Sequence, residues 1–252
     1  MNVGNSALPR TAVAGPEGPY TFFFATSAAL VGNPFLMKNL SYDPVKDFEP
    51  VALVTRSHQV MVVQDVGRAD RAGPGLARKA VDCRRCTPQP CGVTARAFNK
   101  RADTHFVLVP YPNINQGVRD TMAGRIEVGV FSISVVESLI RDGALRAIAI
   151  AANKKSAALP DAPLISETLA GFDLSGWFML MAPAGTPKPI VDRMSAAIAT
   201  AIRDPKIAEM GRKLGFDLEG PEAINPQRAA AYLQEQLALW KQLTAELGIE
   251  AQ

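Results

Sequence analysis

Apolar runs alternate along the chain with polar stretches that carry helix-start and helix-stop residues. The apolar runs are short and rich in β-branched or aromatic side chains, which indicates strands, while the stretches between them have the spacing of amphipathic helices. A succession of strand, capped helix and strand is typical of an α/β fold, here with a parallel sheet. The predicted strands are 20–25, 51–54, 60–63, 106–110, 126–131, 145–151 and 178–183.

Capping residues predict where the helices begin and end. Ser134 with Glu137 three residues later has the spacing of a capping box, and Gly143 is placed to end that helix. A capping residue followed by proline predicts a helix start, because the side chain can accept from free N–H groups and proline fits the first turn. Such pairs stand at 33–34, 186–187, 204–205 and 225–226.

Two of the C-terminal helices carry an apolar stripe at helical spacing. A stripe of this kind is more often a buried core face than a cofactor site, so we interpret both stripes as core. The stripes are Ile190, Met194, Ile198 and Ile202 in one helix, and Leu233, Leu237, Trp240, Leu243 and Leu247 in the other.

Residues 67–97 break the pattern. They hold seven Arg or Lys against two Asp, few large apolar residues, and all three cysteines, Cys83, Cys86 and Cys91. Three interpretations stay open: a thiolate zinc site, a basic patch for an anionic partner, or a segment with no selected role, such as an out-of-frame reading would produce. We favour the third, because so little apolar surface cannot offset the entropy of ordering. We therefore expect 67–97 to be disordered or non-native.

The charge balance and the termini narrow the class of protein. With 27 Lys and Arg against 24 Asp and Glu, the net charge of +3 is too small to indicate binding to nucleic acid. No apolar run approaches the about 18 residues of a membrane span. Residues 1–19 carry one basic residue and no apolar run, so we expect no signal peptide there. We expect no metal ion and no cofactor.

Sequence motifs of known catalytic sites are missing. The chain has no nucleophile elbow, phosphate loop or zinc-protease motif. Neither of its histidines, His58 and His105, has a Ser, Cys or carboxylate nearby at a spacing typical of a catalytic site. We interpret both histidines as structural or surface residues and expect no enzyme activity, because acid–base catalysis needs a positioned group of matched pKa.

Small polar residues follow two of the predicted strands. Thr26, Ser27 and Ala28 come after the first strand, and Ser132 comes after the strand that ends at Phe131. Free N–H groups and the helix dipole make such strand-to-helix junctions suited to anions, and hydroxyls add further donors. Simple N-capping is the alternative interpretation of both junctions.

Several motifs resemble the Bug-type receptors, which are the extracytoplasmic solute-binding proteins of tripartite tricarboxylate transporters. The two most specific motifs are YDPVKDF at 42–48 and APAGTPKP at 182–189. The resemblance covers residues 18–66 and 98–252. Shorter matches are YTFFF at 20–24, NP at 33–34, VPY at 109–111, AGR at 123–125, LPDAP at 159–163 and WF at 177–178.

The resemblance implies a type II periplasmic-binding-protein-like fold, with two α/β lobes, mixed or parallel sheets and a ligand cleft between the lobes. Lobe 1 would comprise 1–56 and 175–252, and lobe 2 would comprise 57–174. The ligand would be a small carboxylate, such as a di- or tricarboxylate, an acidic amino acid or an aromatic acid. A periplasmic location, transporter membrane subunits as partners, and a monomer are also implied. The implied ligand-binding residues are Thr26, Ser27, Ala28, Phe131 and Ser132.

The chain departs from the family pattern in three places. It begins after the family's first strand and ligand loop, and 67–97 stands where a second ligand loop belongs. Phe131 occupies a position at which Asp is common, which indicates a less polar ligand or one without an amino group. Three alternatives stay open: a truncated receptor that does not bind, a non-functional gene fragment, and an α/β enzyme such as a transferase with an anion pocket.

Overall fold

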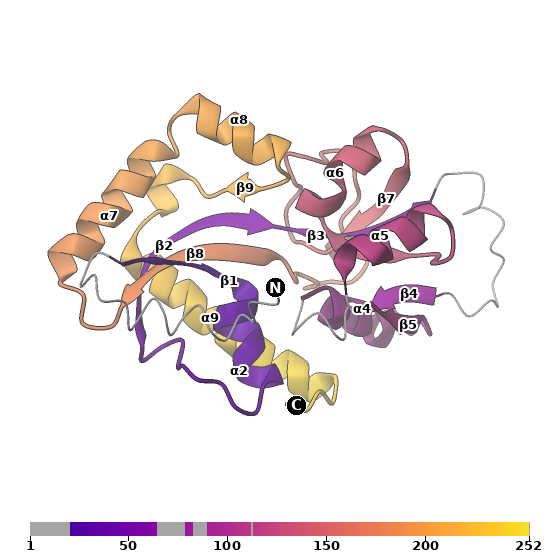
Figure 1. Cartoon of the computed structure of the whole chain (residues 1–252), viewed down its shortest axis with the longest axis horizontal. Helices are drawn as coiled ribbons and strands as arrows, with labels where there is room; N and C mark the ends of the chain where they lie inside the picture. The colour runs from indigo at the N-terminus through magenta and orange to yellow at the C-terminus, as the bar shows by residue number, and fades with distance from the viewer. Residues whose placement is uncertain (1–20, 65–78, 83–89, 112, 252) are drawn as a thin grey trace. The chain divides into compact units, whose positions relative to one another are not determined.

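The computed structural model describes residues 21–64, 79–82, 90–111 and 113–251 (Figure 1). Its strands are β1 (Phe23–Thr26), β2 (Phe48–Ser57), β3 (Gln59–Gln64), β4 (Lys79–Asp82), β5 (Val107–Pro110), β6 (Gly129–Ser132), β7 (Leu145–Ile150), β8 (Gly176–Pro183) and β9 (Asp217–Leu218). Its α-helices are α2 (Asn33–Leu36), α4 (Pro90–Arg101), α5 (Ile114–Met122), α6 (Ile133–Arg141), α7 (Lys188–Ala201), α8 (Pro205–Lys213) and α9 (Pro226–Glu246). Helices of other types are η2 (Ala28–Gly32), η3 (Ile165–Glu167) and η4 (Pro221–Ala223). Within the described ranges, no helix has the length and apolar character needed to cross a membrane.

The chain forms two compact units. Unit 1 holds the described residues up to Arg56 together with Trp177–Gly211 and Leu218–Gln252, and unit 2 holds Ser57–Gly176 and Arg212–Asp217. The chain therefore crosses from one unit to the other at 56/57, 176/177, 211/212 and 217/218. The resemblance assigns all of 175–252 to lobe 1, whereas the structure assigns 212–217 to unit 2, because the turn after α8 packs against the first turn of α6.

Unit 1 is built on a four-stranded sheet with the order β1-β8-β2-β9, and β1 runs antiparallel to β8. Both faces of β8 are covered, which explains its unbroken apolar run. On one face, Trp177 packs edge-on against Tyr232 of α9, with ring centroids 5.5 Å apart. On the other face, Ala182 shares a core with Val191 of α7.

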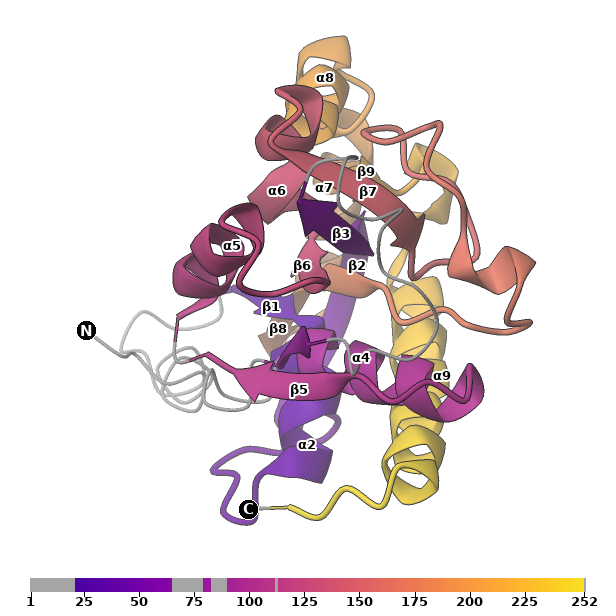
Figure 2. The same ribbon diagram turned by 90° about the vertical axis from the view of Figure 1, so that its right-hand side faces the viewer.

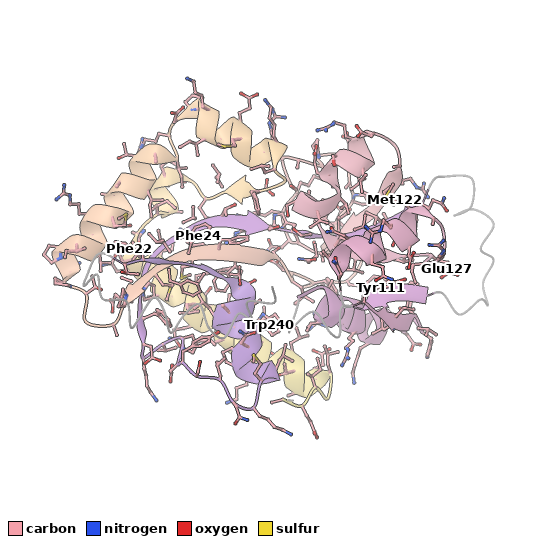
Figure 3. All side chains as sticks on the ribbon, in the orientation of Figure 1. Phe22, Phe24, Tyr111, Met122, Glu127 and Trp240 are labelled. Carbon is pink, nitrogen blue, oxygen red and sulfur yellow. The ribbon has the colours of Figure 1, made fainter. Side chains whose placement is uncertain are left out.

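The two C-terminal stripes contribute to the core, as predicted, although Ile190, Leu237 and Leu247 are only half-buried. Met194, Ile198 and Ile202 of the first stripe pack in the core between α7 and the sheet. In α9, Leu233, Trp240 and Leu243 are buried, and Trp240 marks this helix in Figure 3. The start of α9 is also as predicted, since its N-cap, Asn225, accepts from Arg228 N–H at 2.7 Å.

α2 begins at Asn33, but the prediction that the Asn33 side chain caps a free helix terminus is wrong. The turns of η2 run without a break into α2, so Asn33 lies inside a helical stretch that begins at Ser27. The side chain of Asn33 is fully buried and donates from Nδ2 to the Tyr42 hydroxyl at 3.1 Å. Its role is therefore to join this helical stretch to the turn at 42–48, and not to cap.

Unit 2 contains a three-stranded sheet with β3 between β6 and β7 (Figure 2). The strands β6 and β7, joined by α6, run in the same direction, as a strand–helix–strand succession predicts. However, β3 pairs antiparallel with both, placing Val60 opposite Phe131 on one side and Ile150 on the other. The sheet is therefore mixed. Its core includes Val118 of α5 and Val136 of α6.

Part of the atypical segment is structured, which corrects the expectation for 67–97. β4 pairs in parallel with β5, and α4 begins at Pro90. Within α4, Val93, Ala95 and Ala97 are buried, so a short run of small apolar residues supplies the packing that the segment's overall composition does not indicate. The remainder of 67–97 lies outside the described residues, as do Cys83 and Cys86.

Tyr111 follows β5 and joins it to α5 through Asp120 (Figure 3). Its hydroxyl donates to Asp120 Oδ2 at 2.7 Å, and Arg125 also pairs with this carboxylate at 2.7 Å. Burial, followed by the hydrogen bond to Asp120, raises the pKa of Tyr111 to about 12.

Replacing Tyr111 by Phe should remove a contribution to stability that depends on pH. An unfolded tyrosine ionises at about pH 10, so the contribution is fully present below that pH and is lost as the pH rises through the folded value. The difference in unfolding free energy between wild type and Tyr111→Phe should therefore be constant between about pH 6 and about pH 10, where Asp120 stays ionised, and should narrow above about pH 10. Urea unfolding across this range measures the difference, and a gap that stays constant throughout would contradict the assignment.

Candidate site at the N-terminus of α6

α6 presents its N-terminus directly after β6. Helical conformation begins at Ile133, so Ser132 is the N-cap residue, with an extended backbone at φ −64° and ψ 139°. The predicted capping box is wrong, because Ser134 lies inside the first helical turn. Glu137 pairs instead with Arg141 at 3.1 Å, one turn further along the helix.

Three serine hydroxyls form a row at this terminus. Ser57 Oγ lies 2.5 Å from Ser132 Oγ, which in turn lies 2.8 Å from Ser134 Oγ. Ser57 is buried, Ser132 is half-buried and Ser134 is exposed, so the row leads from the interior to the surface. Three hydroxyls carry three hydrogens, and the two contacts use two of them. One O–H hydrogen is left for an acceptor beyond the row.

The first turn of α6 adds backbone donors to the row. Ile133 N–H donates to the carbonyl oxygen of His58 at 3.0 Å, which anchors the start of the helix to the start of β3. The next two N–H groups, of Ser134 and Val135, lie at the positive end of the helix, where the α-helical pattern supplies no acceptor. Two amides and a hydroxyl at one helix terminus suit a carboxylate.

Gly215 packs against the same turn. Its φ of +70° is open to glycine at little cost, and a Cβ placed on it would lie 2.8 Å from Ser134 N and 2.9 Å from Ile133 Cγ2. The segment after α8 therefore approaches α6 more closely than any larger residue would allow.

Phe131 lies behind this terminus, in the core. Its side chain is fully buried, and its ring covers Gly129, where an added Cβ would meet the ring at 2.2 Å. Its apolar character therefore fits packing in unit 2, and its effect on the polarity of a ligand stays a prediction. Phe131 supports the site by fixing the backbone that leads to Ser132.

The predicted junction in unit 1 is occupied mainly by structural hydrogen bonds. Thr26 Oγ1 accepts from Ala29 N–H at 3.3 Å, as a capping residue does, and buried Ser27 accepts from Trp177 N–H at 3.5 Å. Ala28, the first residue of η2, is half-buried. Both hydroxyls at this junction are thus engaged as acceptors within unit 1.

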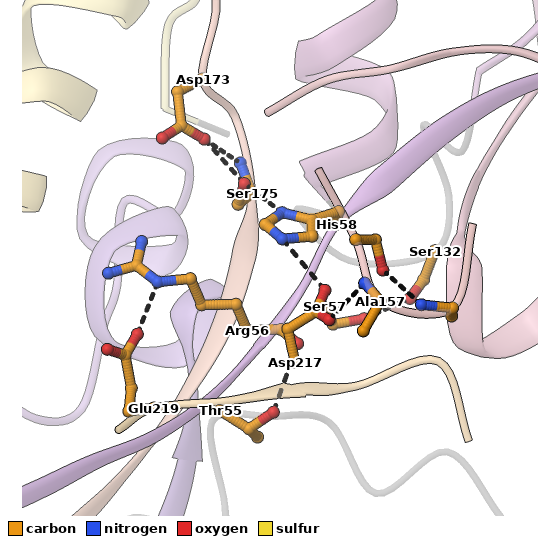
Figure 4. A network of polar contacts seen from close by, with 12 residues as sticks. Thr55, Arg56, Ser57, His58, Ser132, Ala157, Asp173, Ser175, Asp217 and Glu219 are labelled. Atoms are coloured by element: carbon orange, nitrogen blue, oxygen red, sulfur yellow. Dashed lines mark hydrogen bonds and ion pairs between the residues drawn. The ribbon is translucent and has the colours of Figure 1, made fainter. Parts of the chain in front are cut away.

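A buried polar network stands next to Ser57 (Figure 4). His58 is 3% exposed, and its Nδ1 lies 2.7 Å from Ser175 Oγ while its Nε2 lies 3.2 Å from Asp217 Oδ2. Asp217 Oδ1 also accepts from Ala157 N–H at 2.9 Å. Burial alone would raise the pKa of Asp217, but His58 and the Ala157 amide outweigh it and hold that pKa below its usual value.

The group Ser175, His58 and Asp217 has the residue types of a hydrolytic triad, but its hydrogen bonds run the wrong way. A nucleophilic serine must give its proton to histidine. Here the Ser175 hydroxyl donates to Asp173 Oδ1 at 2.7 Å, so it can only accept from the imidazole. The arrangement is therefore a structural one.

The prediction that His58 is structural is confirmed by its burial, and exposed His105 is a surface residue. The accompanying statement that His58 lacks a serine or carboxylate partner is wrong, because its partners come from distant parts of the sequence. Of the residues that the structure describes, no three metal-ligating side chains cluster together.

Alanine at Gly215 should destabilise the fold more than alanine at a matched glycine. Gly143 has a similar φ of +75°, but a Cβ there meets no described atom within 4 Å. We expect Gly143→Ala to cost about 1–2 kcal/mol through backbone strain and Gly215→Ala roughly 2–4 kcal/mol, because contact with α6 adds to that strain. Urea unfolding compares them, and equal losses would contradict the close approach.

Comparisons with known proteins agree with this architecture. The family model described as tripartite tricarboxylate transporter family receptor matches residues 79–249. The match includes residues 79–97, so the favoured interpretation of these residues as a segment with no selected role is wrong. A UPF0065 protein of Bordetella bronchiseptica is 28% identical over 253 residues, covering 98% of this chain and 74% of that protein. A UPF0065 protein of Agrobacterium vitis is 30% identical over 242 residues, covering 88% and 67%.

Solved structures of similar fold are binding proteins. R. palustris Rpa4515 with adipate has a TM-score of 0.83 at 22% identity, covering 99% of this chain and 84% of that chain. The periplasmic binding protein BugD has a TM-score of 0.79 at 21% identity, covering 98% and 84%. MatC from Rhodopseudomonas palustris with bound malate has a TM-score of 0.75 at 25% identity, covering 94% and 83%. These likenesses confirm the predicted periplasmic-binding-protein fold, and the family match over 79–249 shows that the chain belongs to the tripartite tricarboxylate transporter receptor family.

Proposed function

We propose that this chain is a solute-binding receptor that captures a small carboxylate for a tripartite tricarboxylate-type transporter. The observation that carries the proposal is the row of Ser57, Ser132 and Ser134 hydroxyls at the N-terminus of α6. An ionised carboxylate accepts hydrogen bonds and donates none. The row supplies one free O–H, and the first helical turn supplies two N–H groups and a partial positive charge.

The chemistry of this terminus fits capture and release better than turnover. Its donors are hydroxyls and amides, which bind an anion without exchanging a proton with it. The buried His58 nearby contacts Ser175 and Asp217. It is not placed to take a proton from the Ser175 hydroxyl, because that hydroxyl donates to Asp173. MatC, at 25% identity, carries malate, and this supports a di- or tricarboxylate as the ligand class.

The proposal extends to the remaining ligand residues, the location and the partners. In unit 1, Thr26, Ser27 and Ala28 would contribute through the backbone, since the two hydroxyls already accept hydrogen bonds. Membership of the receptor family supports a periplasmic location and delivery of the solute to the membrane subunits of a transporter. We propose that the receptor acts as a monomer.

Removing the Ser132 hydroxyl should weaken carboxylate binding. Ser132→Ala loses one neutral donor from the row, so the Kd for malate should rise roughly 3- to 10-fold. Ser138→Ala is the matched control, because Ser138 is an exposed serine further along the same helix and should leave the Kd unchanged. Calorimetric titration of the three proteins measures the effect.

The same titration tests the proposal as a whole. A wild-type chain that binds none of malate, adipate and citrate would contradict the receptor function and favour a non-binding fragment. Conversion of any of these ligands into a product would favour an enzyme. If Ser132→Ala and Ser138→Ala raised the Kd for malate equally, the carboxylate would not bind at the N-terminus of α6.

A further inference from the structure

His58 is the one residue between β2 and β3, just after the chain has entered unit 2 at 56/57. Its two side-chain partners lie at other crossings. Ser175 precedes the crossing at 176/177, and Asp217 precedes the crossing at 217/218. A single buried ring therefore joins three of the four segments through which the chain passes between the units (Figure 4).

The hydrogen bonds around the ring fix one of its protons. Ser175 has one hydroxyl hydrogen, and Asp173 accepts it at 2.7 Å, so Ser175 Oγ must accept from His58 Nδ1–H. The other ring nitrogen, Nε2, lies 3.2 Å from Asp217 Oδ2. The ring is thereby held between a hydroxyl on one side and a carboxylate on the other.

Two carboxylates face the ring. Asp217 faces it directly from β9, and Asp173 faces it through Ser175 from the segment that precedes β8. Arg56, which precedes Ser57 in the sequence, is paired with Glu219 at 2.6 Å in unit 1.

The ring also determines the geometry of the α6 terminus. The backbone carbonyl of His58 holds Ile133 N–H at 3.0 Å, and the hydroxyl of the preceding Ser57 holds that of Ser132. A displacement of His58 would move the acceptor that anchors the first turn and one member of the hydroxyl row together.

We propose that His58 is a positioning residue for the carboxylate site, and that its ring, held by Ser175 and Asp217, keeps these segments in the arrangement in which α6 presents its donors. This inference rests on the proposed function, because it assigns His58 an effect on carboxylate affinity. The ring does not contact the ligand, and its effect passes through Ser57 and Ile133.

The test compares His58→Gln with His105→Gln by calorimetric titration with malate. His105→Gln should bind malate as wild type does, because His105 is an exposed residue outside the network. His58→Gln should bind malate roughly 3- to 30-fold more weakly than wild type.

The outcomes separate the two hypotheses. If wild type binds no malate, adipate or citrate, the proposed function fails and this inference fails with it. If wild type binds malate and His58→Gln shows the same affinity, the inference is overturned while the proposed function stands. Should His58→Gln fail to fold, Ser175→Ala removes one partner of the ring and should also weaken malate binding. An unchanged affinity of Ser175→Ala would then overturn the inference.

Discussion

The buried imidazole of His58 must find a polar partner at each nitrogen, and much of the structure depends on where those partners lie. Leaving one such buried group without a partner would cost about 1–3 kcal/mol, more when it is charged. Ser175 and Asp217 meet this requirement, and both belong to segments at which the chain crosses between units. The backbone carbonyl of His58 also accepts from Ile133 N–H at the start of α6. One residue thereby contacts segments at three of the crossings and the N-terminus of one helix.

The candidate site follows from this constraint and from ordinary helix chemistry. The amides of an N-terminal turn and a serine at the N-cap are common to many helices, and alone they indicate no ligand. In this chain the N-cap hydroxyl of Ser132 turns toward Ser57 and Ser134 and away from its own helix. The first-turn amides and one hydroxyl hydrogen are thereby left for an anion.

Local sequence signals predicted most of the elements, because they depend on neighbours along the chain. Asn225 before Pro226 marked the start of α9, Gly143 marked the end of α6, and the stripe at Leu233 and Trp240 marked a buried face. The failures concern long-range contacts. The antiparallel placement of β3 between β6 and β7 depends on pairing between distant strands, which apolar spacing does not encode.

The candidate site was predictable only in part, for the same reason. Ser132 was identified from its place after a strand, which is a local signal. His58 was interpreted as a residue without partners, because Ser175 and Asp217 are remote in sequence. The prediction that 67–97 is disordered failed for a different reason. The composition of the whole segment is polar, but three residues close together in it, Val93, Ala95 and Ala97, are buried.

The central claim is that the N-terminus of α6 receives a carboxylate of the solute. A crystal structure of the chain grown with malate tests it most directly. The account predicts a malate carboxylate oxygen within about 3 Å of Ser132 Oγ, Ser134 Oγ or Ser134 N. Ordered malate bound elsewhere, with the donors of α6 contacting none of its oxygens, would contradict it.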